Sequence, residues 1–207
     1  MARNFGEIAF SDDVKAQQEK HGSRRSNSRM DASMQNMELG VAETDFISER
    51  DGFYMATVGA NAYPYVQFRG GPTGFLKVLD SSTLGFADFR GNLQYISVGN
   101  LTGNNRAALF LMDYANRRRL KIFATIEVVD AALDPELMAR LEDPSYPARI
   151  ERAMVLHVEA FDWNCPQHIT PRYTIDEVRE MNAPLLEHIA ALESEVESLR
   201  ASSRPAR

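Results

Sequence analysis

Short strand-like segments separated by turn signals follow one another from Phe53 to Trp163, and they constrain the fold more than any other feature of the sequence. Apolar or alternating residues mark segments such as FYMATVGA, LGFADF and RLKIFATIEVVD, and polar turns separate them. About six strands are expected, with turn signals at intervals of roughly 8 to 15 residues. This pattern is typical of a small antiparallel barrel with short helical insertions. The expected fold class is therefore mainly β with peripheral helices, α+β.

Short helices are expected around these strands. They span residues 43–50, with Thr44 as the cap, and residues 94–101, 135–141 and 146–152. All four are peripheral to the expected sheet, which occupies a domain of residues 43–173.

The two ends of the chain differ in texture from this domain. Residues 1–42 are polar and mixed in charge, and we expect an N-terminal helical or mobile arm there, with a short helix over residues 14–19 capped by Ser11 or Asp12. Residues 174–207 are expected to form a C-terminal helix that starts at the Thr174 capping signal. It carries an a/d heptad seam made of Leu185, Ile189, Leu192, Val196 and Leu199. A helix of this length needs a packing partner, which is either the tail of a second chain or the chain's own body.

The composition argues against several classes of protein. A formal net charge of −6 at pH 7 argues against a dedicated nucleic-acid binder, which would present a basic face. No apolar run approaches the ~20 residues that span a bilayer, and the N-terminus MARNFGEIAF has no apolar signal region. The single cysteine, Cys165, excludes an internal disulfide, and the four histidines lack metal-binding spacing. We therefore expect a cytoplasmic protein without a metal, and with neither nucleic acid nor a membrane as partner.

The stretch FADFRGNLQYISVGN, residues 86–100, places an arginine, a glycine and amide side chains where a strand gives way to a helix. Gly91 lets the backbone approach a ligand, and a helix that starts near Asn92 would direct free N–H groups and a positive dipole end at the turn. The side chains that could add donors are those of Arg69, Lys77, Arg90, Gln94 and Ser97. Two readings stay open. One is a cradle for an anionic ligand, and the other is a polar turn in which Asn92 caps a helix while Arg69 and Lys77 are solvated.

A second candidate site is the segment FDWNCPQHITPRY, residues 161–173. Its indole, Trp163, stands beside the carboxamides of Asn164 and Gln167, a set that suits a flat heterocycle with donors and acceptors on its edge. The alternative is a rigid, proline-rich loop in which Trp163 belongs to the core. Cys165 lacks the neighbours that would activate it as a nucleophile.

The order of these pieces resembles the pyridoxamine 5′-phosphate oxidase-like family of FMN-binding split barrels. The resemblance runs from about Phe46 to Tyr173, and two segments carry it: QFRGGP with FADFRGNLQYIS, and WNCPQHI. It implies a six-stranded antiparallel split β-barrel that forms a homodimer with FMN at the subunit interface. A nicotinamide electron donor is a candidate partner.

The resemblance also implies which residues bind FMN. The phosphate side would be formed by Val66, Gln67, Arg69, Lys77, Arg90, Gly91, Asn92, Gln94, Tyr95 and Ser97. The partner chain would close the ring with Trp163, Asn164 and Gln167. In such proteins the flavin carries the redox chemistry by hydride transfer at N5, so no catalytic side chain is assigned.

One departure from the family pattern affects the expected substrate. The Arg-Leu-His-Asp ending that holds vitamin B6 in the oxidase itself is absent, and the heptad helix stands in its place. The leading hypothesis is therefore an FMN-dependent oxidoreductase on a small organic substrate. The alternatives are a flavin-binding or stress-response module without catalysis, a split barrel for a deazaflavin or haem, and a coiled-coil adaptor.

Overall fold

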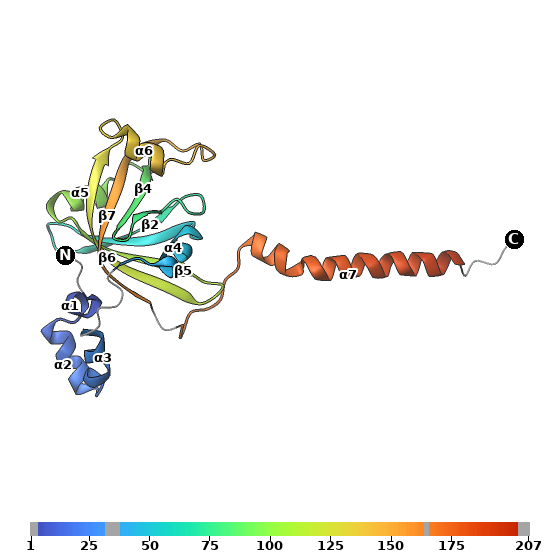
Figure 1. Ribbon diagram of the computed structural model, residues 1–207, viewed down its shortest axis with the longest axis horizontal. Helices are drawn as coiled ribbons and strands as arrows, with labels where there is room; N and C mark the ends of the chain where they lie inside the picture. Colours follow the sequence, from blue (N-terminus) through green and yellow to red (C-terminus); the bar gives the residue numbers. More distant parts are fainter. Residues whose placement is uncertain (1–3, 32–37, 164–165, 203–207) are drawn as a thin grey trace. The chain divides into compact units, whose positions relative to one another are not determined.

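A single antiparallel sheet forms the centre of the protein. The computed structural model describes residues 4–31, 38–163 and 166–202. Within them, seven strands pair in the order β2-β1-β5-β6-β7-β4-β3 (Figure 1). The strands are β1 (Gly52–Val58), β2 (Pro64–Gly70), β3 (Lys77–Asp80), β4 (Thr83–Phe89), β5 (Arg106–Asp113), β6 (Arg118–Asp130) and β7 (Ile150–Trp163).

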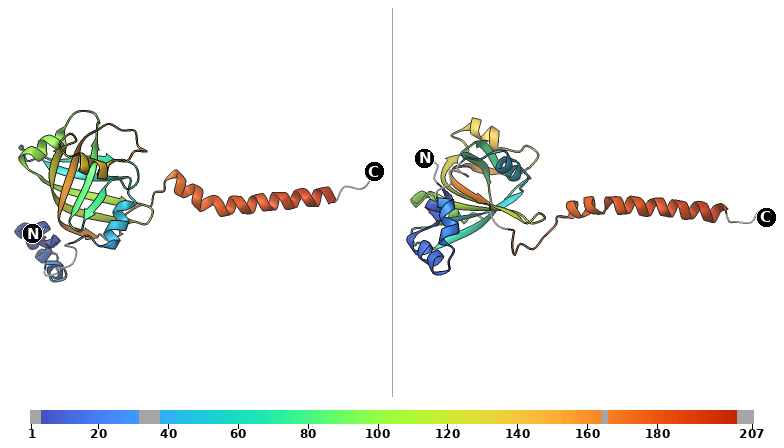
Figure 2. Two further views of the ribbon diagram at one scale, coloured as in Figure 1. Left: turned by 45° about the horizontal axis from the view of Figure 1, so that its top comes forward. Right: turned by 60° about the horizontal axis from the view of Figure 1, so that its bottom comes forward.

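Tight turns fix the hairpins of this sheet. The β1–β2 connection contains Ala62 at φ 63°, and the β5–β6 connection contains Arg117 at φ 56°. Left-handed residues of this kind match the twist of paired strands. The long strands β6 and β7 pair from Leu120↔Trp163 to Asp130↔Arg152, with a register shift between Phe123 and Ala124. Such a bulge increases the local twist, and the sheet is visibly curved (Figure 2).

The concave side of the curved sheet encloses the main core. Alternate residues of the strands point into it, as in β1, where Phe53 and Met55 are buried while Tyr54 is exposed. Helix α4 (Val41–Ser48) adds Phe46 and Ile47, which are 1% and 0% exposed. A smaller cluster forms where α6 (Pro135–Leu141) packs on β4 and β7 through Met138 and Leu141. The alternation therefore decides which side chains of each strand remain available on the convex side.

Several sequence-based expectations need correction. The α+β class is confirmed, but the sheet has seven described strands rather than six, and its edge strands β2 and β3 do not pair to close it. The helix expected over residues 146–152 is wrong, because β7 begins at Ile150 and pairs with β4 and β6. Helix α5 (Ile96–Gly103) begins later than expected, and α4 is preceded by Gly40 rather than capped by Thr44.

The N-terminal region contains three short helices. They are α1 (Phe5–Ala9), α2 (Asp12–Lys20) and α3 (Arg24–Asp31). The expected Ser11 cap of α2 is confirmed, with the Ser11 hydroxyl accepting from the Val14 N–H, and the Ser- and Arg-rich run of the expected helical or mobile arm forms α3. The Phe5 ring of α1 stacks on Phe123 of β6 with centroids 5.0 Å apart, so this region contacts the convex side of the sheet.

The C-terminal helix α7 (Ile175–Ser202) belongs to a separate unit of the chain. Contacts divide the protein into Met1–Asp113 with Arg117–Gln167, and Tyr114–Asn116 with His168–Arg207. The expected cap is confirmed, because the Glu177 N–H donates to the Thr174 hydroxyl at 3.2 Å. Pro184 lies inside the continuous helix. None of the helices in the described ranges is both long and apolar enough to cross a membrane.

Candidate anion-binding pocket

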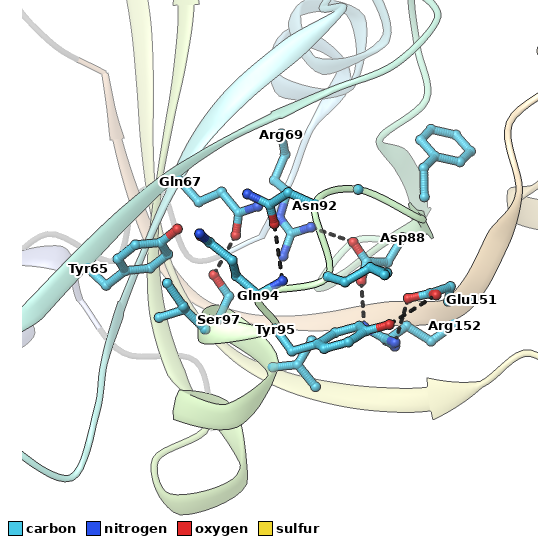
Figure 3. Close-up of a pocket in the computed structure, with 15 residues that line it drawn as sticks. Tyr65, Gln67, Arg69, Asp88, Asn92, Gln94, Tyr95, Ser97, Glu151 and Arg152 are labelled. Carbon is cyan, nitrogen blue, oxygen red and sulfur yellow. Dashed lines mark hydrogen bonds and ion pairs between the residues drawn. The ribbon is translucent and has the colours of Figure 1, made fainter.

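A pocket opens where β2, the β4–α5 turn and the start of β7 meet (Figure 3). Three segments that are far apart in the sequence supply its walls. The lining residues are Tyr65, Gln67, Arg69, Asp88, Phe89, Gly91, Asn92, Leu93, Gln94, Tyr95, Ile96, Ser97, Val98, Glu151 and Arg152. The turn expected to cradle an anion therefore does lie beside the hairpin strand that carries Arg69.

The alternation of strand β2 selects which of its side chains reach the pocket. Tyr65, Gln67 and Arg69 are half-buried and line it, whereas Val66 and Phe68 point to the opposite side and are each 59% exposed. This follows from the period of two in an extended strand. Val66 was expected among the binding residues, and its side chain does not line the pocket.

The β4–α5 turn has an unusual backbone. Leu93 and Tyr95 have φ values of 63° and 51°, in the left-handed region that bulky residues rarely occupy. The Asn92 side chain accepts from the Gln94 N–H at 3.2 Å, so it stabilises the turn and does not cap the helix. Tyr95 is the N-cap of α5, and its side chain makes no capping hydrogen bond to the helix. The first N–H groups of α5 therefore have neither an intrahelical partner nor a capping side chain, and they lie at the pocket.

A network of charges forms one wall of the pocket. Asp88 accepts from Arg69 Nη1 through one oxygen and from Arg152 Nη1, at 3.1 Å, through the other. Arg152 also donates to Glu151 at 2.9 Å, and the Tyr95 hydroxyl lies 3.2 Å from the same carboxylate. The Arg152 guanidinium lies over the Tyr95 ring, 5.1 Å from its centroid. This network fixes the position of both guanidinium groups.

The Asp88 carboxyl is nearly inaccessible to solvent, with 5% of its side chain exposed. Burial raises the pKa of Asp88 above its ordinary value of 3.8, while the charges of Arg69 and Arg152 oppose this shift. Desolvation disfavours the ionised form of a buried acid. The Asp88 carboxylate therefore pairs with both arginines although its burial disfavours the ionised form.

Arg69 retains an unused donor. Its Nε atom is buried and has no hydrogen-bond partner within the described residues. Nearby, the Ser97 hydroxyl donates to Gln67 Oε1 at 2.8 Å, which links β2 to the first turn of α5. A Cβ placed on Gly91 would meet no atom within 4 Å, so open space borders the backbone there. An oxyanion that accepts from Arg69 Nε and from α5 N–H groups matches this set of donors.

The structure brings together a large part of the expected site. The expected residues that line the pocket are Gln67, Arg69, Gly91, Asn92, Gln94, Tyr95 and Ser97. Arg90 lies next to it, with Nε 3.8 Å from Glu151. Lys77 does not line it. The charge of Lys77 acts instead on Asp143, which does not line the pocket either. The pKa of Asp143 is lowered mainly by hydrogen bonds from Ser145 and to a smaller extent by Lys77.

The second expected cluster lies elsewhere in the chain. Trp163 donates from its indole N–H to Glu43 at 2.7 Å and packs edge-on against Phe46, with centroids 4.8 Å apart. Arg118 lies over its ring at 4.9 Å. Within its own chain Trp163 therefore attaches the end of β7 to α4. Gln167 is exposed, and Asn164 lies outside the described residues.

Some pocket residues were not expected from the sequence. Asp88 was overlooked inside an apolar strand, and Glu151 and Arg152 were assigned to a helix. The segment IERAMVLHVE, residues 150–159, shows no period of two before Leu156, so no local pattern placed Glu151 and Arg152 on a strand. Tyr65 precedes the expected binding residues on the same face of β2 and could have been found by its period of two.

Comparisons with known proteins bear on this region. The family model for pyridoxamine 5′-phosphate oxidase matches residues 42–164, well over half of the 207 residues. A candidate pyridoxamine 5′-phosphate oxidase from Lactobacillus delbrueckii is similar in structure, with TM-score 0.47, 21% identity, and coverage of 62% of this chain and 97% of that one. No curated protein matches the chain.

Two further solved structures are similar at comparable levels. HupZ of Group A Streptococcus has TM-score 0.45 and 14% identity, over 65% of this chain and all of that one. An FMN-binding protein from Syntrophomonas wolfei has TM-score 0.42 and 13% identity, over 59% of this chain and 83% of that one.

Proposed function

Because the chain belongs to the pyridoxamine 5′-phosphate oxidase family, we propose that it binds FMN in the pocket described above and acts as an FMN-dependent oxidoreductase on a small organic substrate. Oxidation of vitamin B6 is not included, because residues 174–207 carry the heptad helix where the resemblance would place the Arg-Leu-His-Asp segment that holds that substrate. We also propose that the sheet forms a six-stranded split barrel. Its walls would consist of β1, β2 and β4 to β7, and β3 would be an additional edge strand.

The buried, unpartnered Nε of Arg69 is the observation that carries this proposal. Leaving a buried donor without a partner costs free energy, about 1–3 kcal/mol. A phosphate oxygen at this point would supply the missing acceptor and would also receive N–H groups from the start of α5. The arginine fork and the positive helix end both suit a dianion.

Each part of the pocket has a role in this proposal. Arg69 and Arg152 would hold the phosphate, while Gln67 and Ser97 would fix β2 against α5. Tyr65 and the left-handed Tyr95 would line the path from phosphate to ring. When bound, FMN supplies the redox chemistry through its ring, so that the side chains only bind, orient and exclude water.

A second copy of the chain is part of the proposal, because the convex side of the sheet carries an apolar surface. Its cross-strand rows run from Phe68 through Tyr54 to Phe110, and from Val66 through Ala56 and Ala108 to Phe123. We name these seven residues the outer face. Its exposed part consists of Tyr54, Val66 and Phe68, because Phe5 of α1 stacks on Phe123 at the other end. Exposed apolar residues grouped in this way mark protein–protein contacts. Pairing of two outer faces would form a homodimer and bring a partner's residues towards the FMN.

The binding experiment compares FMN with riboflavin, which lacks the phosphate. We expect the purified chain to bind FMN at least tenfold more tightly than riboflavin, and Arg69→Gln to remove most of this difference. A hydrogen bond to a charged group is worth about 1.5–3 kcal/mol, or roughly 10- to 150-fold in affinity. Arg118→Gln is the control, since Arg118 lies on β6 outside the pocket. Equal losses for FMN and riboflavin in Arg69→Gln would refute the phosphate site.

Spectroscopy distinguishes the proposal from its alternatives. The purified protein is expected to be yellow, with flavin absorbance that bleaches when NADPH or another nicotinamide donor is added without oxygen. Flavin that binds but is never reduced by any donor would favour a non-catalytic module. A Soret band would indicate haem, and a colourless protein that takes up no FMN would refute flavin binding.

The homodimer is tested on dilution, by molar mass, in a parent chain that carries Leu192→Glu, so that the apolar seam of α7 does not hold two copies together. Val66→Glu is then added to this parent chain. A charge on the outer face should dissociate the dimer at concentrations where the parent chain remains dimeric. Tyr63→Glu is the matched control, because Tyr63 is 75% exposed and precedes β2, outside the outer face. Equal masses for the parent and Val66→Glu at every dilution would exclude the outer face as the interface.

A further inference from the structure

Helix α7 presents an apolar seam to solvent along its length. Leu185, Ile189, Leu192 and Val196 are 57%, 42%, 47% and 43% exposed. The spacing assigns them alternately to d and a positions, and the same register extends in both directions along the helix. The a positions are then Ile175, Asn182, Ile189 and Val196, and the d positions are Val178, Leu185, Leu192 and Leu199.

The residue types in this register match one kind of coiled coil. β-branched residues at a, here Ile189 and Val196, with leucine at d favour two parallel strands. A single asparagine at an a position, here Asn182, fixes register and strand number at some cost in stability. Pro184 falls at a c position, away from the seam, and the helix continues through it. The helix therefore has the residues of a two-stranded pair and not those of a surface helix that packs on a sheet.

Charges beside the seam agree with a parallel pair of identical helices. In such a pair a g residue lies beside the e residue of the partner's next heptad, five positions further along. Glu195 occupies g and Arg200 occupies e, so the pair would carry attraction between opposite charges on both of its sides. His188 at g would likewise lie beside Glu193 at e. Both facing pairs are complementary when the second helix is another copy of α7 in the same register.

We propose that α7 pairs with α7 of a second copy of this chain in a parallel, in-register, two-stranded coiled coil. The seam of a and d residues named above would be buried between the helices, and Glu195 would pair with Arg200 of the other copy. This inference uses only α7 and does not depend on flavin binding.

Cysteine cross-linking in the full chain tests the pairing and its direction. Cys165 is first replaced by serine, and Leu199→Cys is then introduced near the end of the seam. In a parallel pair the two thiols face each other, so mild oxidation should convert most of the protein to a covalent dimer. Ser194→Cys is the matched control, since its f position points away from the seam and should cross-link at least fivefold less.

Two results would overturn the proposal. Leu199→Cys could form no covalent dimer, as expected if α7 covers its own chain or if two copies pair antiparallel with the thiols at opposite ends. It could also cross-link no better than Ser194→Cys, as expected for random collision.

A charge exchange tests the pairing between copies independently. Glu195→Arg should lower the cross-linking yield of the Leu199→Cys reporter by roughly threefold, because the introduced arginine would then face Arg200 of the other copy. The double variant Glu195→Arg with Arg200→Glu should restore the yield. The thermal transition of each variant checks that the sheet domain is intact. A double variant no better than the single variant would contradict the pairing.

Discussion

Replacing Asp88 by asparagine is expected to tighten FMN binding, although the change removes two ion pairs. Asp88 engages both Arg69 and Arg152 and lies with Glu151 at the same wall of the pocket. The region has only a small net positive charge, because its three arginines, Arg69, Arg90 and Arg152, are largely balanced by these two carboxylates. A phosphate dianion must therefore share Arg69 with a carboxylate of the protein.

The magnitude follows from the geometry of this shared arginine. A carboxylate and a phosphate on opposite sides of one guanidinium are about 6 Å apart, which corresponds to about 3 kcal/mol per charge pair at an effective dielectric constant of about 20. Solvent at the mouth of the pocket reduces this repulsion. We expect a gain of about 1.5 kcal/mol, roughly tenfold in the dissociation constant of FMN. Riboflavin affinity should stay the same.

The free energy of unfolding of Asp88→Asn provides a second quantitative expectation. Breaking a buried ion pair typically costs about 3–5 kcal/mol. Burial raises the pKa of Asp88, however, so its ionised form is already disfavoured in the folded chain. The asparagine variant should therefore unfold within about 1 kcal/mol of the parent in urea at neutral pH. Titration by flavin fluorescence and unfolding by circular dichroism give the two values. Weaker FMN binding, with riboflavin unchanged, would show that Asp88 orients Arg69 for the phosphate and would refute the competition.

The remaining predictions concern pH and two other positions. The pKa of Asp88 is raised in the folded chain, so its contribution to the free energy of unfolding is full below pH 3.8 and is lost as the pH rises through the higher folded pKa. Asp88→Asn should lack this pH dependence when urea unfolding is measured across the pH range. Gly91→Val should leave the thermal transition unchanged, because its Cβ has free space, but should weaken FMN binding at least tenfold if the phosphate approaches that backbone; unchanged affinity would place the ligand elsewhere. Trp163→Phe removes the hydrogen bond to Glu43 and should cost about 1.5 kcal/mol of unfolding free energy, whereas a large loss of FMN affinity would support the partner-chain role expected from the sequence.

The strands could be predicted from the sequence because alternation is a local signal that burial preserves. In β1 the buried Phe53 and Met55 alternate with the exposed Tyr54, whereas β5 was predicted from its continuous apolar run AALFLM, residues 107–112. The start of β7 could not be read this way. Residues 146–152 are helix-like in composition, but Arg152 pairs across the sheet with Asp88 and Asp130. Such long-range pairing overrides local propensity, which is a weak signal.

The site was predictable only where its residues are close in the sequence. The turn from Gly91 to Ser97 carries its own polar pattern, and Arg69 lies on the neighbouring hairpin. Asp88 could not be assigned to it, because its partners come from β2 and β7 at separations of 19 and 64 residues. Lys77 was expected from sequence proximity to the same hairpin, yet the pairing Lys77↔Gly85 places it on β3, which lies at the other edge of the sheet from β2.

Strand β2 connects the two parts of the proposed function through its alternation. Gln67 and Arg69 line the pocket, while Val66 and Phe68, the residues directly before each of them, belong to the outer face. As an edge strand, β2 pairs with β1 alone among the described strands, so its position depends on what packs against both of its sides. Pairing of two outer faces would hold Val66 and Phe68 and so restrict the movement of Arg69. A shift of one residue in the register of β2 would exchange the two sets of side chains and abolish both surfaces together.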